Sequence, residues 1–143
     1  MDLFRALDIS ASGLSAHKSR MDVIAENLAN SETLVTASGG PYRRKAAVLE
    51  AASSGGFATA LRSESVPEGG VQVSRVVETM DPPRRVHDPA HPHAGADGFV
   101  SYPNVNALTE MVDMLATTRA YEANASAFQA TKSMGTKLLE LLR

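Results

Sequence analysis

Residues 6–30 read ALDISASGLSAHKSRMDVIAENLAN, and this stretch decides the fold. Apolar side chains recur in it every seven residues, at Leu7, Leu14, Met21 and Leu28. That spacing places them on one stripe of a helix. We therefore predict a helix from residue 3 to about residue 30, roughly 42 Å long if each residue rises by about 1.5 Å. Because polar residues interrupt the stripe, this helix should be only marginally stable alone.

A second long helix is predicted at the other end of the sequence, over residues 104–143. It follows Pro103, and either Asn104 or Asn106 can cap its first turn. At full length it would reach roughly 57 Å. Its apolar stripe consists of Met111, Met114, Tyr121, Ala125, Phe128, Leu139 and Leu142.

Residues 31–103 have a different pattern. Glycine, proline and serine cluster at residues 38–41, 53–56 and 67–70, which indicates turns. Residues 71–76 alternate apolar and polar side chains, as a half-buried strand does.

Two weaker strands are predicted at residues 42–49 and 98–102, and the prolines of residues 81–94 favour an extended run. The expected fold is thus mainly α with a small β insert. Residues 1–30 and 104–143 should form an antiparallel, coiled-coil-like pair around the insert of residues 31–103.

Composition excludes several classes of function. The formal net charge is −2, so no overall field attracts nucleic acid or an anionic membrane. The absence of cysteine removes disulfides, thiol catalysis and thiolate metal sites. No apolar run approaches the roughly 20 residues that span a bilayer, and the first residues do not resemble a secretory signal peptide.

The two helical stripes are wider or longer than one partner helix can cover, which indicates an assembly interface. Gly13 either admits a close helix neighbour or marks a kink. Asn27 and Asn30 either hydrogen-bond between subunits or, for Asn30, simply end the helix. Tyr121 either anchors a neighbouring subunit or packs on the first helix. The predicted interface is Leu7, Gly13, Leu14, Met21, Ile24, Asn27, Leu28, Asn30, Met111, Met114, Tyr121, Ala125, Phe128, Leu139 and Leu142.

The N-terminal block ALDISASGLSA, followed by RMDVIAENLAN, resembles the signature of flagellar rod and hook proteins. Further blocks are similar to the proximal-rod class of that family, in the same order. They are GPYRRK (40–45), DPAHP (88–92), ADGFV (96–100), PNVN (103–106), EMVDM (110–114) and RAYEAN (119–124). The sequence departs from the family pattern at residues 31–36, and residues 50–70 match no pattern.

The resemblance implies a structural subunit of the flagellar basal-body rod. Such a subunit is exported through the flagellar type III apparatus without a cleaved signal peptide. It polymerises with itself and with other rod proteins into a helical axle that transmits torque across the periplasm, and both terminal helices form its inner coiled-coil layer. Contact of the insert with the basal-body membrane ring, with peptidoglycan or with another rod protein is left open.

Other interpretations are weaker. His87, Asp88, His91, His93 and Asp97 suggest a metal site or hydrolase, but the adjacent prolines impose extended geometry. The basic run of residues 43–45 could bind phosphate, although pairing with acidic neighbours is the commoner role. The sequence holds no nucleophile elbow, phosphate loop or dinucleotide fingerprint. We predict no enzyme activity, cofactor, nucleic acid or small-molecule substrate. The main alternative is a soluble helical adaptor that forms a small closed oligomer.

Overall fold

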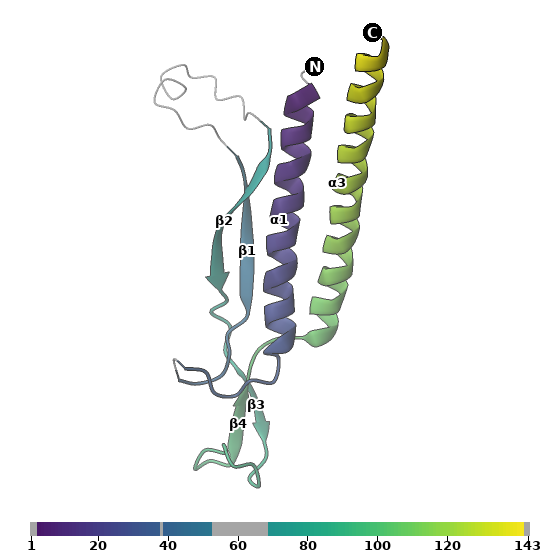
Figure 1. The fold of residues 1–143 in the computed structure, drawn as a ribbon. Helices are drawn as coiled ribbons and strands as arrows, with labels where there is room; N and C mark the ends of the chain where they lie inside the picture. Colours follow the sequence, from purple (N-terminus) through teal and green to yellow (C-terminus); the bar gives the residue numbers. More distant parts are fainter. Residues whose placement is uncertain (1–2, 38, 53–68, 142–143) are drawn as a thin grey trace, which may run out of the picture.

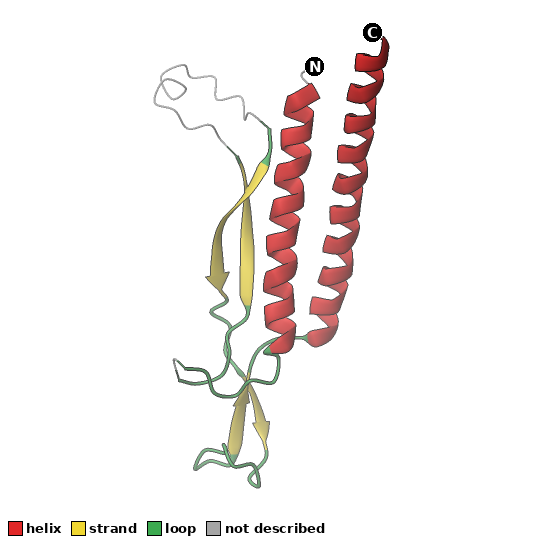
Figure 2. Ribbon diagram, viewed as in Figure 1, coloured by secondary structure: helices red, strands yellow, loops and turns green. Residues whose placement is uncertain are grey.

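The computed structural model describes residues 3–37, 39–52 and 69–141. Two long helices, α1 (Leu3–Ala29) and α3 (Ala107–Leu141), flank a segment that contains the strands. The strands are β1 (Lys45–Ala51), β2 (Val71–Glu78), β3 (Arg84–His87) and β4 (Phe99–Tyr102). Figure 2 shows that helix predominates, which confirms the prediction of a mainly α fold with a small β insert.

The helices α1 and α3 lie side by side and run in opposite directions (Figure 1). Asn27 at the end of α1 bonds to Glu110 at the start of α3, whereas Leu3 lies against Gly135 near the other end. At about 1.5 Å per residue, α1 is roughly 40 Å long and α3 roughly 52 Å. The last turn of α3 therefore extends beyond the first turn of α1 (Figure 1).

Local side chains set the inner ends of both helices. The Asn106 carboxamide oxygen accepts hydrogen bonds from the backbone N–H groups of Leu108 (3.0 Å) and Thr109 (3.3 Å), so Asn106 is the cap of α3. At the end of α1, the side-chain amide of Asn30 donates to the carbonyl of Glu26 (2.9 Å). Asn30 therefore ends the helix, as one of the two interpretations held.

The strands β1 and β2 form an antiparallel pair that packs on α1. The pairing runs from Lys45↔Glu78 to Ala51↔Val71, with a bulge where Val48 and Leu49 lie opposite Arg75 and Val73. The strand predicted at residues 71–76 is confirmed, and the one predicted at 42–49 begins only at Lys45. The turn expected at residues 53–56 lies outside the described residues.

Side chains of α1 meet the beginning of β2 closely. The backbone N–H of Val71 donates to the Ser12 hydroxyl (3.1 Å). A Cβ on Gly69, whose φ is +75°, would lie 2.8 Å from Ile9 Cδ1. Among the described elements, α3 packs on α1 but not on the strands, so α1 is the central element of the fold.

The strands β3 and β4 form a second antiparallel pair, below the helices in Figure 1. Their register runs from Arg84↔Tyr102 to His87↔Phe99. The strand predicted at residues 98–102 is thus confirmed as β4. The sequence predicted only extended chain where β3 lies, because Pro82 and Pro83 obscure a strand of four residues.

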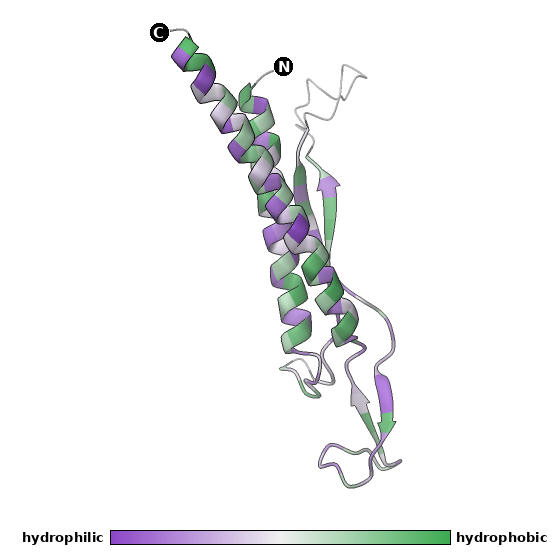
Figure 3. Cartoon of the chain, turned by 90° about the vertical axis from the view of Figure 1, so that its right-hand side faces the viewer, coloured by the Kyte–Doolittle hydropathy of each residue, from purple (hydrophilic) through white to green (hydrophobic). Residues whose placement is uncertain are grey.

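The core is small and partly polar. Within the described ranges, the buried apolar side chains are Ala16, Ile24, Tyr42, Val100 and Pro103, and the buried polar ones are Asn27, Glu110 and Thr117. Many large apolar side chains of α3 are instead exposed, and Figure 3 shows the apolar colour at the start of that helix. No helix in the described ranges combines the length and apolar character needed to cross a bilayer.

Candidate functional site

At the junction of α1, α3 and β1, the polar side chain of Asn27 is almost completely buried, with 1% of the residue's surface exposed. Its amide nitrogen donates to the carbonyl of Lys45 (2.8 Å) and to Glu110 Oε2 (3.1 Å). Its amide oxygen accepts from the backbone N–H of Lys45 (2.8 Å) and from the Tyr42 hydroxyl (3.0 Å). All four hydrogen-bonding positions of the carboxamide are therefore occupied within the chain.

Glu110 lies in the first turn of α3 and is also 1% exposed. Its second carboxylate oxygen, Oε1, accepts from Arg44 Nε at 2.7 Å, and an Arg44 terminal nitrogen lies 3.9 Å from Asp113 Oδ2. A buried carboxylate is stable only when it is paired and hydrogen-bonded. Arg44 supplies the opposite charge, and the dipole at the start of α3 adds to it.

The next residue, Lys45, pairs with α1 on the other side of the junction. Its ammonium group lies 2.5 Å from Glu26 Oε1, and both side chains are partly exposed. This ion pair contributes at most about 1 kcal/mol, because solvent screens it. The basic run of residues 43–45 therefore supplies two cations that pair with acidic neighbours, which was one of its two interpretations.

Tyr42 is buried against the same junction. Burial, together with the nearby carboxylates Glu26, Glu78 and Glu110, raises the pKa of its hydroxyl from 10.0 to about 12. The hydroxyl therefore stays protonated at neutral pH and remains a donor to Asn27.

A hydrogen-bonded loop positions Tyr42 and Arg44. The backbone N–H of Thr36 donates to the carbonyl of Gly40 (2.9 Å), and that of Tyr42 donates to Thr33 (3.0 Å). Gly39 and Gly40 have φ values of +83° and +82°, which glycine adopts without strain. The GPYRRK block thus has a structural role: its glycine reverses the chain, and its next residues enter the junction.

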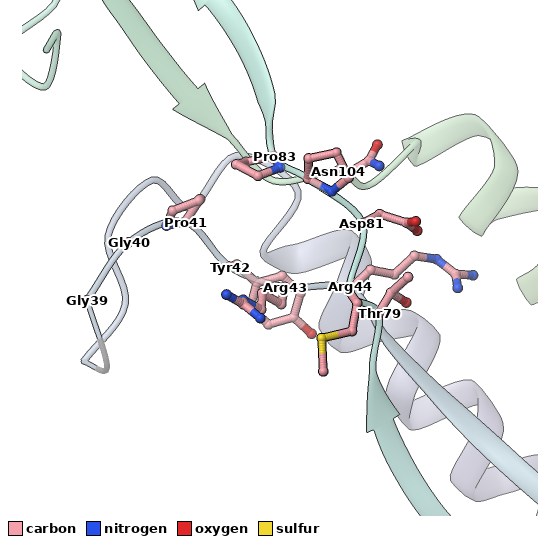
Figure 4. A pocket seen from close by; sticks show the side chains of 12 residues that line it. Gly39, Gly40, Pro41, Tyr42, Arg43, Arg44, Thr79, Asp81, Pro83 and Asn104 are labelled. Carbon is pink, nitrogen blue, oxygen red and sulfur yellow. The ribbon is translucent and has the colours of Figure 1, made fainter.

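A pocket of about 230 Å³ lies beside this loop (Figure 4). Residues 39–44 form one wall, residues 79–83 another, and Asn104 completes the lining. The pocket marks where the loop before β1 meets the connections to β3 and α3.

The predicted interface residues of α1 lie on its inward side. Gly13, Ile24 and Asn27 are buried. A Cβ on Gly13 would lie 3.1 Å from Asn124 Nδ2, so this glycine lets α3 approach closely, as one interpretation held. The others are half-buried: Leu7, Leu14, Met21, Leu28 and Asn30.

The predicted stripe of α3 is divided between two environments. Met114, Tyr121, Ala125 and Phe128 are half-buried. Met111 is exposed because the face of α3 that packs on α1 instead carries Glu110 and Thr117. Leu139 is exposed because it lies on the part of α3 that extends past α1. Leu142 lies outside the described residues.

The sequence did not predict that Tyr42, Arg44 and Glu110 form one cluster. Arg44 and Glu110 are 66 positions apart, and no spacing rule connects them. The available signal was that both belong to blocks typical of the rod family.

The histidine and aspartate residues proposed as metal ligands have other neighbours. Asp97 pairs with Arg85, and Asp88 accepts a bond from the backbone of Ala90 (3.2 Å). The His87 ring packs edge-on against Phe99, with ring centres 5.0 Å apart. Within the described ranges, no three His, Asp or Glu side chains are arranged to hold a metal ion.

Two family models match the sequence. Residues 7–33 match the model described as flagella basal body rod protein. Residues 96–141 match the model described as flagellar basal body rod FlgEFG protein C-terminal. These segments include most of α1 and α3, and they define the chain as a protein of the flagellar rod class.

Full-length relatives define the family more narrowly. The flagellar basal-body rod protein FlgC of Bacillus subtilis is 42% identical, over 99% of both chains. FlgC of Salmonella typhimurium is 38% identical over 99% of this chain and 98% of its own. FlgC of Borreliella burgdorferi is 36% identical over 100% of this chain and 99% of its own. The chain belongs to the FlgC family of flagellar basal-body rod proteins, and the resemblance seen in the sequence is confirmed.

Proposed function

We propose that this protein is a structural subunit of the flagellar basal-body rod that polymerises through α1 and α3. Membership of the FlgC family supports the rod assignment. The exposed apolar surface of α3 supports assembly through the helices, and it is the observation that carries the proposal.

That surface consists of two patches on one helix. The first patch is Leu108, Met111, Val112 and Leu115, spaced i, i+3, i+4 and i+7, with 49–72% of each side chain exposed. The second patch is Met134, Leu138, Leu139 and Leu141, at the end that extends past α1. Patches at opposite ends of one helix favour contacts between different faces, which build an open array rather than a closed oligomer.

The alternative of a small closed adaptor has no support among the relatives, all of which are rod proteins by name. The proposal includes coiled-coil packing of α1 and α3 in the assembled rod, with the predicted interface residues in that layer. Its partners are further copies of this chain and other rod proteins. No catalytic step or cofactor is part of the proposed role.

The remaining features of the proposal are those that the resemblance in the sequence implies. The subunit is exported by the flagellar type III apparatus without a cleaved signal peptide, and it lies in the basal body where the rod crosses the periplasm. The β3–β4 pair, at the far end of the insert from the helices, is the part best placed to contact the basal-body ring.

The test is Leu139→Asp, introduced in the source bacterium. Leu139 is 70% exposed, so the free energy of unfolding of the purified chain should change by less than about 0.5 kcal/mol. A carboxylate buried between subunits is strongly unfavourable, so rod assembly and swimming should be lost. Swimming on soft agar and electron microscopy of basal bodies measure this.

Ser133→Asp is the matched control, because it adds the same charge to an exposed polar position of α3. It should leave swimming close to normal. Normal swimming of Leu139→Asp at normal expression would contradict an assembly role for the second patch.

A further inference from the structure

The first turns of α3 meet α1 through the buried contact of Glu110 with Asn27. Four of their large apolar side chains form the first patch and are exposed, whereas Met114 is half-buried. The buried side chains of these turns are Glu110 and Thr117. Because most large apolar side chains of these turns are exposed, the docking of α3 depends strongly on how well Glu110 is satisfied.

Among the described residues, Arg44 is the only cation that forms an ion pair with Glu110. Without it, the carboxylate would retain the bond from Asn27 but lose its counter-charge in a buried position. The helix would then have to release Glu110 to solvent, and the first turns of α3 would leave α1.

Arg44 is also fixed to the insert. It immediately precedes Lys45, whose backbone N–H and carbonyl both bond to the Asn27 side chain, as a neighbouring strand would. The carbonyl of Arg44 accepts a hydrogen bond from Thr79 (2.8 Å), just past the end of β2. Arg44 therefore cannot move far unless the start of β1 moves with it.

We propose that Arg44 is a latch that couples the docking of α3 on α1 to the position of the β1–β2 pair. When Arg44 contacts Glu110, the helix pair and the β1–β2 pair form one rigid unit. When the contact opens, the first turns of α3 and the start of β1 become free together. The latch belongs to the single chain, so it does not depend on the proposed role in the rod.

One consequence does rest on that role. The turns controlled by the latch are the ones that carry the first patch, so the latch determines whether that patch is an ordered surface. A segment of a neighbouring subunit that held the loop before β1 in place would then favour assembly at the first patch.

The test is hydrogen exchange of the purified monomer for Arg44→Met, Glu110→Gln and the double variant. Methionine keeps the length of the arginine stem without its charge, and glutamine keeps the shape of Glu110 without a buried charge. In Arg44→Met, amides of residues 107–117 and 45–51 should exchange about tenfold faster or more, because the stranded carboxylate favours opening. In the double variant, both segments should return most of the way to wild-type rates.

The control is Arg43→Met, because Arg43 is the exposed neighbour in the same loop. It should change the same rates by less than about twofold. Residues 128–141 give an internal reference, since they lie far along α3 from the latch and should not respond.

Several results would overturn the latch. One is faster exchange in residues 45–51 alone, which would mean a local loop effect without coupling to α3. Another is a double variant whose change in exchange rate equals the product of the changes in the two single variants. If Arg44→Met does not fold, recovery of the fold by the added Glu110→Gln supports the latch, and continued failure refutes it. All measurements use the monomer, so they stand apart from the Leu139→Asp test of assembly.

Discussion

The two ends of the α1–α3 pair are built on opposite principles. At the junction end, where Asn27 meets Glu110, the side chains are polar and almost completely buried. At the open end, where Leu3 meets Gly135, the large apolar side chains beyond the contact, Leu138, Leu139 and Leu141, are exposed. Both arrangements are unusual for a protein that functions as a monomer.

The difference separates two tasks within one helix pair. A polar network that satisfies every member fixes one geometry, because a displaced partner leaves a buried group unpaired. Exposed apolar side chains do not fix the geometry of the monomer. They stabilise an assembly most when another subunit buries them. The junction end therefore determines how the chain folds, and the open end is available for assembly.

The largest effect is expected from Asn27→Ala. This change removes four hydrogen bonds and leaves the Tyr42 hydroxyl, Glu110 Oε2 and the backbone of Lys45 without the Asn27 partner in a buried site. The free energy of unfolding should fall by about 3 kcal/mol or more. Urea unfolding followed by circular dichroism measures it.

Asn30→Ala is its matched control, three positions further along. Asn30 makes only local bonds at the helix end, so its loss should cost about 1 kcal/mol or less. Equal losses in the two variants would mean that the junction is not a special source of stability.

The sequence predicted most of the fold because the deciding signals are local. Heptad spacing predicted α1, an apolar stripe predicted α3, and alternation predicted β2. Asn104 or Asn106 after Pro103 predicted the start of α3. The short strand β3 was missed because its four residues carry only one half-buried apolar side chain, Val86.

The candidate site was less predictable because its contacts join distant parts of the chain. Asn27 was identified as important but was assigned a bond across subunits, whereas the structure fills its amide with partners from the loop and from α3. Glu110 was absent from the predicted site because a carboxylate beside an apolar stripe normally faces solvent. Only its pairing with Arg44 makes burial tolerable, and that pairing has no sequence signature.

A smaller effect should appear at alkaline pH through Tyr42. Its pKa is about 12 in the folded chain and about 10 when unfolded, so the folded state holds the proton more tightly between these values. The stability it contributes is complete below pH 10 and is lost as the pH rises toward 12, by roughly 1–2 kcal/mol. Unfolding measured from pH 9 to pH 11.5 should show this slope.

Tyr42→Phe should remove that part of the slope, although it also lowers stability at neutral pH by leaving Asn27 short of one donor. Tyr102→Phe is the control, because Tyr102 is half-buried in β4 away from the junction. If the wild type, Tyr42→Phe and Tyr102→Phe all show the same pH dependence above pH 10, the pKa of Tyr42 is not raised in the folded chain.

The smallest effects compare the open end of the helix pair with its middle, through one glycine at each place. A Cβ on Gly135 would lie 2.8 Å from Leu3 Cδ2, which is the far end of a flexible side chain and can move aside. A Cβ on Gly13 would lie 3.1–3.3 Å from three atoms of the Asn124 carboxamide, which must shift as a unit. Alanine in place of a helical glycine gains up to about 1 kcal/mol.

Gly135→Ala should therefore stabilise the chain by about 0.5–1 kcal/mol, while Gly13→Ala should gain less or become slightly destabilising. Urea midpoints of the two variants, measured at one protein concentration in the monomer range, compare them directly. The reverse order would mean that the open end is packed more tightly than the middle of the pair. Stability would then not decline from the junction toward the open end, and the division of tasks between the two ends would be lost.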